Sequence, residues 1–145
     1  MPTQIFVNLP TVDLDRSKAF YETLGATIVP AFTDENAACV RWDENVFFMV
    51  LTREYFATFT TRPVVLGSEG AQVITALSRD SREDVDAIRE RILAAGGSEN
   101  KEPQDHGFMY SVSMADPDGN IIEFMWMDPV AAQDGPEAFL DQQGS

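Results

Sequence analysis

The stretch "DPDGNIIEFMWMD", residues 116–128, joins a tight turn to an almost wholly apolar segment. Pro117 and Gly119 suit a reversal of the chain, and the apolar run at 121–127 predicts a strand. Glu123 is the one carboxylate inside that run. A carboxylate surrounded by Ile, Phe and Met side chains is costly unless something compensates it. Glu123 therefore points either to solvent or into a site that needs it.

Outward from this stretch, the chain divides into two similar halves. Strands are expected at 4–9 and at 72–78, which lie 72 − 4 = 68 residues apart. A helix is expected after each strand, with Asp13 and Ser81 as N-caps, and 81 − 13 = 68 again. Ser81 and Asp84 have the spacing of a capping box. The equal offsets indicate a duplicated unit.

Each half continues with further strands. They are expected at 26–29, 37–42 and 46–51 in the first half, and at 108–115 and 121–127 in the second. The first half has the order β-α-β-β-β, and the equal offsets indicate that the second half repeats it, which predicts an α+β fold. Because a single sheet does not bury its own face, the two sheets are expected to pair around a shared interior.

The predicted organisation is one domain spanning 1–145. It consists of a module at 4–58, a second module at 71–128, a connecting segment at 52–70 and a flexible polar tail at 130–145. The connecting segment carries three aromatic residues with the spacing of a short helix, namely Tyr55, Phe56 and Phe59. They either cover a cavity or bury themselves against the sheet as part of a linker.

Composition excludes several classes of function. The formal net charge of −14 and the pI near 4.2 argue against nucleic acid as a partner. The longest apolar run, Val46 to Leu51, is too short to span a membrane. The single cysteine, Cys39, excludes a disulfide within the chain. Because no secretory signal is visible at the start of the sequence, we expect a cytoplasmic location.

Four segments carry a resemblance to a known family. They are "VNLPTVDLDRSKAFYETLG" (7–25), "DSREDVDAIRERILAAGG" (80–97), "DHGFMYSVSMADPDGN" (105–120) and "DPDGNIIEF" (116–124). Over residues 4–128 the chain resembles the vicinal oxygen chelate superfamily, which includes glyoxalase I, extradiol dioxygenases, and the fosfomycin and bleomycin resistance proteins. The second and third segments resemble a glyoxalase-like subgroup of it.

The resemblance implies two paired βαβββ modules that form a curved mixed sheet around a cleft. It also implies a divalent metal in that cleft and a homodimer. The ligand positions that it implies, transferred by aligning the turns and helix starts of the two halves, fall on Phe6, Phe48, Ile74 and Glu123. Three of these side chains cannot coordinate an ion, and catalytic metals need several N, O or S donors.

Two further residues carry donor atoms. Asn8 is two residues from Phe6 and is expected on the same face, but it offers only a neutral oxygen. The single histidine, His106, lies outside the ligand positions that the resemblance implies. We therefore expect no tightly bound metal and no other cofactor. The expected site is an apolar pocket around Glu123, and its expected ligand-binding residues are Phe6, Asn8, Phe48, Ile74, Ile121 and Met125.

Three functions remain open from the sequence. The first is a metal-independent protein that binds a small molecule in this pocket. The second is a glyoxalase-like lyase or isomerase acting on a small carbonyl compound, with Glu123 as general base. The third is a weakly metal-dependent enzyme. A structural role is the alternative for Glu123, in which it pairs with Asn8, Tyr110 or His106.

Overall fold

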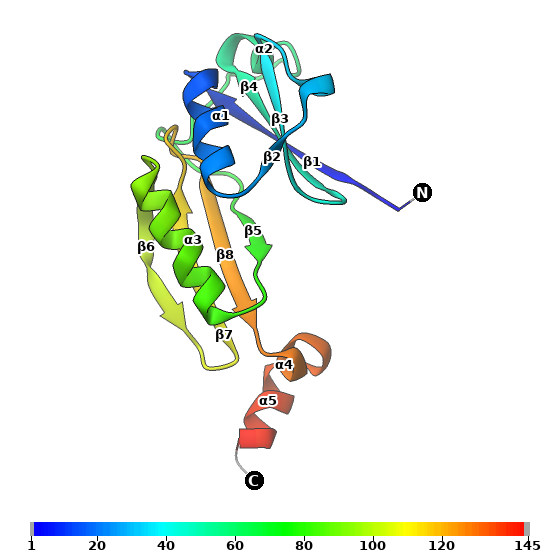
Figure 1. Cartoon of the computed structure of the whole chain (residues 1–145), viewed down its shortest axis with the longest axis vertical. Coiled ribbons are helices and arrows are strands. Elements are labelled where there is room, and N and C mark those ends of the chain that lie inside the picture. The colour runs from blue at the N-terminus through cyan, green and yellow to red at the C-terminus, as the bar shows by residue number, and fades with distance from the viewer. Residues whose placement is uncertain (1, 144–145) are drawn as a thin grey trace.

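The computed structural model describes residues 2–143. The first of its two sheets has the strand order β1-β4-β3-β2 and consists of β1 (Ile5–Thr11), β2 (Thr27–Ile28), β3 (Ala37–Asp43) and β4 (Val46–Thr52). The second has the order β5-β8-β7-β6 and consists of β5 (Thr75–Ser78), β6 (Ser98–Asp105), β7 (Met109–Ala115) and β8 (Ile121–Met127). The predicted α+β fold of two βαβββ modules is confirmed (Figure 1).

One long helix belongs to each module. Helix α1 (Leu14–Thr23) contacts β3 and β4, and α3 (Arg82–Ala94) contacts β6, β7 and β8. Both predicted N-caps are present, because Asp13 accepts a hydrogen bond from the Arg16 amide and Ser81 accepts one from the Asp84 amide, each at 3.0 Å. These bonds satisfy amides that a helix start leaves unpaired. Two short elements, η1 (Pro30–Phe32) and α2 (Arg53–Ala57), complete the first module.

The helix-facing sides of both sheets form one hydrophobic core. At its centre the Trp42 ring lies 5.8 Å from the Phe124 ring of the other module, and Tyr21 meets Trp42 edge-on at the same distance. The expected shared interior is therefore made by the sides that carry the helices. The opposite side of each sheet, called its open face here, is covered by neither α1 nor α3 (Figure 1).

The register of the final strand agrees with the prediction. Ile122 and Phe124 are buried in the core, so Ile121, Glu123 and Met125 alternate onto the open face of the second sheet. The structure therefore answers the question that the sequence raised about Glu123. It faces away from the core and is only half-buried.

The C-terminal segment differs from the prediction of a flexible tail. It forms α4 (Pro129–Asp134) and α5 (Pro136–Gln143), which project beyond the second module (Figure 1). Residues 144–145 of the predicted tail lie outside the described residues, and the mobility of the segment stays a prediction. The longest helix of residues 2–143 is α3, with 13 residues, and no helix in this range is long and apolar enough to cross a membrane.

Candidate ligand site

Strand pairing in the first sheet places two rows of side chains on its open face. One row runs from Phe6 on β1 through Phe47 on β4 to Arg41 on β3. The next runs from Asn8 through Met49 to Cys39 in the same strands. Because paired residues point to the same side of a sheet, these six side chains form one surface. Phe6 and Phe47 are stacked, with ring centroids 4.7 Å apart.

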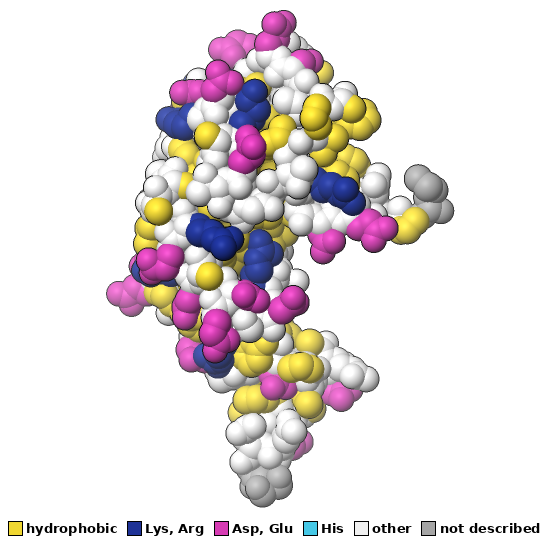
Figure 2. All heavy atoms as spheres, in the orientation of Figure 1, with side chains coloured by type: hydrophobic (Ala, Val, Ile, Leu, Met, Phe, Trp, Pro, Cys, Tyr) yellow, Lys and Arg dark blue, Asp and Glu magenta, His cyan; other side chains and the backbone are white. Residues whose placement is uncertain are grey.

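A hollow of about 420 Å³ lies over these rows. That volume falls within the range of roughly 300–1,000 Å³ typical of small-molecule sites. Its lining combines six apolar residues with three polar ones, namely Phe6, Val29, Phe32, Cys39, Phe47 and Met49 with Gln4, Arg41 and Glu44. Figure 2 shows hydrophobic side chains gathered on the side of the first module where η1 lies. Burial raises the pKa of the Cys39 thiol, which favours its neutral form.

The sequence-based assignment of Phe48 to this surface is wrong. Phe48 is fully buried on the helix-facing side, where it meets Tyr21 and Trp42 edge-on at 5.8 and 5.5 Å. Counting residues from each turn puts Phe48 in phase with Glu123 only if both final strands start in the same phase. The two turns differ in length, because two residues separate Asp43 from Val46 and five separate Ala115 from Ile121. Equal counts from the two turns therefore do not give equal phases in the strands that follow. Phe47 occupies the open face instead.

Glu123 belongs to the other sheet. It pairs with Ser113 on β7 and Ala76 on β5, and Ile121 and Met125 flank it on the same face. No hydrogen bond or ion pair joins its carboxylate to any other part of residues 2–143. The hollow on the first sheet takes no lining residue from the second module. The sequence predicted that Phe6 and Glu123 line one pocket. In the single chain they lie on different sheets and do not share one.

The other proposed neighbours of Glu123 also lie elsewhere. Ile74 is exposed and precedes β5, although it is in phase with Ala76. Tyr110 lies on the helix-facing side and donates a hydrogen bond to Asp86 at 2.6 Å. His106 stacks on Phe108 in the loop between β6 and β7. The alternative in which Glu123 pairs with Asn8, Tyr110 or His106 is therefore not seen within residues 2–143.

The connecting segment does not line the hollow. Tyr55 and Phe59 pack edge-on against each other at 5.1 Å and remain partly exposed. Further along, the amide of Ser68 donates to the Asp118 carbonyl at 3.0 Å. The backbone at Gly67 passes so close to the turn that only glycine fits there, because an added Cβ would lie 2.3 Å from the backbone of Asn120. The segment is therefore anchored to the 116–120 turn.

Sequence reasoning missed a buried polar cluster at that same turn. Asp118 accepts hydrogen bonds from Thr11 at 2.6 Å and from the Arg16 guanidinium at 2.9 Å. Asp116 accepts one from the Tyr21 hydroxyl at 2.7 Å. Burial raises the pKa of Asp116, although hydrogen bonds from Tyr21 and Asn120 act to lower it. Because the Thr11, Arg16 and Tyr21 donors belong to the first module and both carboxylates to the second, the cluster ties the two modules together.

The sequence profile of the Glyoxalase/Bleomycin resistance protein/Dioxygenase superfamily matches residues 4–124. The chain belongs to this superfamily. A hypothetical protein of S. aureus has the same fold, with a TM-score of 0.74 and 22% identity over 87% of this chain and 94% of that one. A glyoxalase-related enzyme from Fulvimarina pelagi gives 0.73 and 21% over 90% and 91%.

A bleomycin resistance determinant encoded on transposon Tn5 also shares the superfamily fold. Its TM-score is 0.60, with 21% identity over 87% of this chain and 98% of that one. Among curated protein sequences, none matches this chain. At these levels of identity the structural neighbours show the fold alone, and a function has to be argued from the site.

The donor set does not fit the divalent metal that the superfamily implies. At the positions transferred from the family, only Glu123 carries a donor, and the corresponding open face of the first sheet presents Phe6 and Phe47. Within residues 2–143, no three His, Cys, Asp or Glu side chains are grouped so that they could hold an ion.

Proposed function

We propose that this superfamily member binds a small apolar molecule on the open face of the first sheet, without a tightly held metal. The hollow over Phe6, Phe47 and Met49 carries this proposal, because it joins sufficient volume to a mainly apolar lining. Apolar surface removed from water contributes roughly 25 cal/mol per Å² to binding before the costs of association. The site lies on paired strands, and a rigid scaffold limits those costs.

The names of proteins with this fold support two kinds of function. They include a bleomycin resistance determinant and a fosfomycin resistance protein, and also a lactoylglutathione lyase. A binding role draws only on the shape and apolar lining of the hollow. Catalysis needs in addition a reacting group, and Glu123 is the candidate on the second sheet. We therefore favour the binding role over catalysis.

Replacing Phe6 by Ala is expected to weaken the binding of a neutral aromatic probe, 2-naphthalenemethanol, by about tenfold. The Phe6 ring is 48% exposed and stacked on Phe47, so its removal takes away contact area worth roughly 1.5 kcal/mol. Isothermal titration calorimetry measures the affinity directly.

Phe59→Ala is the matched control, because Phe59 is also exposed and does not line the hollow. It is expected to bind the probe as the unaltered chain does. Binding is also expected to survive dialysis against EDTA. No binding by the unaltered chain, or equal loss in both variants, would contradict the assigned hollow, and loss after chelation would contradict metal independence.

We further propose that the chain forms a homodimer. Apolar side chains are exposed at the start of both modules, at Ile5, Phe6 and Ile74, and patches of this kind mark interaction surfaces. Light scattering on the purified chain is expected to give 2 × 16.1 = 32.2 kDa. A mass of 16.1 kDa at micromolar concentration would contradict the dimer.

Glu123 supports a second candidate function, a lyase or isomerase acting on a small carbonyl compound. Its half-exposed carboxylate has no partner within residues 2–143, so it is free to accept a proton from a bound substrate.

If this second role holds, Glu123→Gln is expected to lower kcat by about 100-fold or more while KM stays within about twofold. Steady-state kinetics on an aldehyde–thiol adduct, with Glu102→Gln on the exposed strand β6 as control, separates the roles. Unchanged turnover in the Glu123 variant would exclude it as the base.

A further inference from the structure

The row formed by Phe6, Phe47 and Arg41 also indicates the chemical class of the ligand. We propose that the hollow takes a flat, apolar carboxylate, with its ring against the two phenylalanines and its carboxylate on the Arg41 guanidinium. This proposal rests on the proposed binding function of the same hollow. It adds an orientation and a charge to that function.

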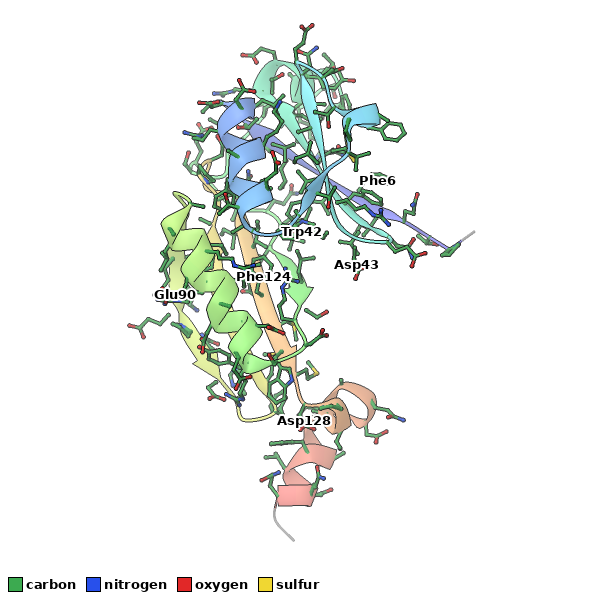
Figure 3. The ribbon with its side chains drawn as sticks, in the orientation of Figure 1. Phe6, Trp42, Asp43, Glu90, Phe124 and Asp128 are labelled. Atoms are coloured by element: carbon green, nitrogen blue, oxygen red, sulfur yellow. The ribbon has the colours of Figure 1, made fainter. Side chains whose placement is uncertain are left out.

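The aromatic end of the row suits a flat ring. Phe6 and Phe47 lie nearly parallel, with 11° between their ring planes. Phe6 lies on β1, away from the Trp42 and Phe124 rings at the junction between the modules (Figure 3). Its ring is therefore available to a ligand and not engaged in the core. Aromatic rings prefer offset-stacked or edge-to-face contacts, which add roughly 0.5–1.5 kcal/mol to the area they bury.

Arg41 supplies the polar end of the row. It pairs with Phe47 in the β3–β4 register, so the guanidinium and the stacked rings lie on one surface. Its Nε donates to the Asp43 carbonyl at 3.3 Å. Its two terminal amino groups have no hydrogen-bond partner within residues 2–143. Such a pair of donors matches the two oxygens of a carboxylate.

Two features of the chain oppose an anionic ligand, one local and one overall. Glu44 also lines the hollow, and the net charge of −14 repels anions. Glu44 is exposed in the turn between β3 and β4, outside the row. Charges farther than about 8–10 Å are largely screened at physiological salt. A direct contact with the guanidinium therefore decides the charge of the preferred ligand. Glu44 lowers the affinity for an anionic ligand.

The proposal is tested with three probes that share one ring system: 2-naphthoate, 2-naphthalenemethanol and 2-naphthylmethylamine. At pH 7.5 the naphthoate is expected to bind about tenfold more tightly than the alcohol, and the amine no more tightly than the alcohol. Arg41→Gln is expected to remove the advantage of the naphthoate. Glu44→Gln is expected to increase it. Arg53→Gln, on α2 outside the hollow, is the control and is expected to change neither affinity.

The possible results separate the two levels of the proposal. If the alcohol binds and the naphthoate binds no better, the carboxylate class is overturned while the binding function stands. If the amine binds best and Glu44→Gln removes that preference, the ligand is cationic and the assignment of Arg41 is overturned. If none of the three probes binds, the binding function fails, and this proposal fails with it.

Discussion

Asp118→Ala is expected to lower the free energy of unfolding by about 3–5 kcal/mol. The Asp118 side chain is only 1% exposed and is salt-bridged to Arg16 at 2.9 Å. It also accepts hydrogen bonds from the Thr11 hydroxyl at 2.6 Å and the Val12 amide at 3.0 Å. Removing the acceptor leaves the Val12 amide unpaired and takes from the Thr11 hydroxyl its shortest hydrogen bond. An unpaired buried polar group costs roughly 1–3 kcal/mol.

Urea unfolding followed by circular dichroism measures this loss. Asp15→Ala is the matched control, since the Asp15 side chain is 95% exposed and its ion pair with Lys18 lies at the surface. Surface pairs of this kind contribute roughly 0–1 kcal/mol. A loss in Asp118→Ala no larger than in the control would show that the cluster at the 116–120 turn does not join the modules.

Phe124→Ala is expected to cost a similar 3–5 kcal/mol, for a different reason. The Phe124 ring is fully buried and lies 5.8 Å from Trp42 of the first module. The Arg79 guanidinium sits 4.8 Å above the same ring. The substitution therefore opens a cavity and removes a cation–π contact at the junction of the two modules.

The thermal unfolding midpoint is the second readout for this variant. A loss of 3 kcal/mol lowers the midpoint of a domain of this size by roughly 10 °C. The matched control is Phe59→Ala, which also replaces a phenylalanine by alanine but at an exposed position. It is expected to lower the free energy of unfolding by less than about 1 kcal/mol. A midpoint within 2 °C of the unaltered chain for Phe124→Ala would contradict a core shared by the modules.

The features that sequence reasoning predicted correctly are local ones. The caps at Asp13 and Ser81 depend on residues three positions apart. The phase of β8 was readable because Glu123 marks one side of a run that is otherwise apolar. The repeat offset of 68 predicted the duplication, and with it the shared interior, from the spacing of these signals alone.

Features without a local signal were missed. Strand β6, with the sequence SENKEPQD, is exposed at every position, so it shows no alternation of apolar and polar residues. It forms because β7 pairs with it along the edge of the sheet. The Asp118 cluster was missed because its partners Thr11 and Arg16 lie more than 100 residues away.

By itself, the sequence of this protein determined the α+β class, the two modules, their helix starts and the side of β8 on which Glu123 lies. Only the tertiary structure decided that Phe47 and not Phe48 joins Phe6 and Arg41 on the open face. The run VFFMVL is apolar at every position, so alternation cannot identify its buried side. The side that is buried is set by pairing with β1 and by contact with α1, and these interactions join residues far apart in the chain.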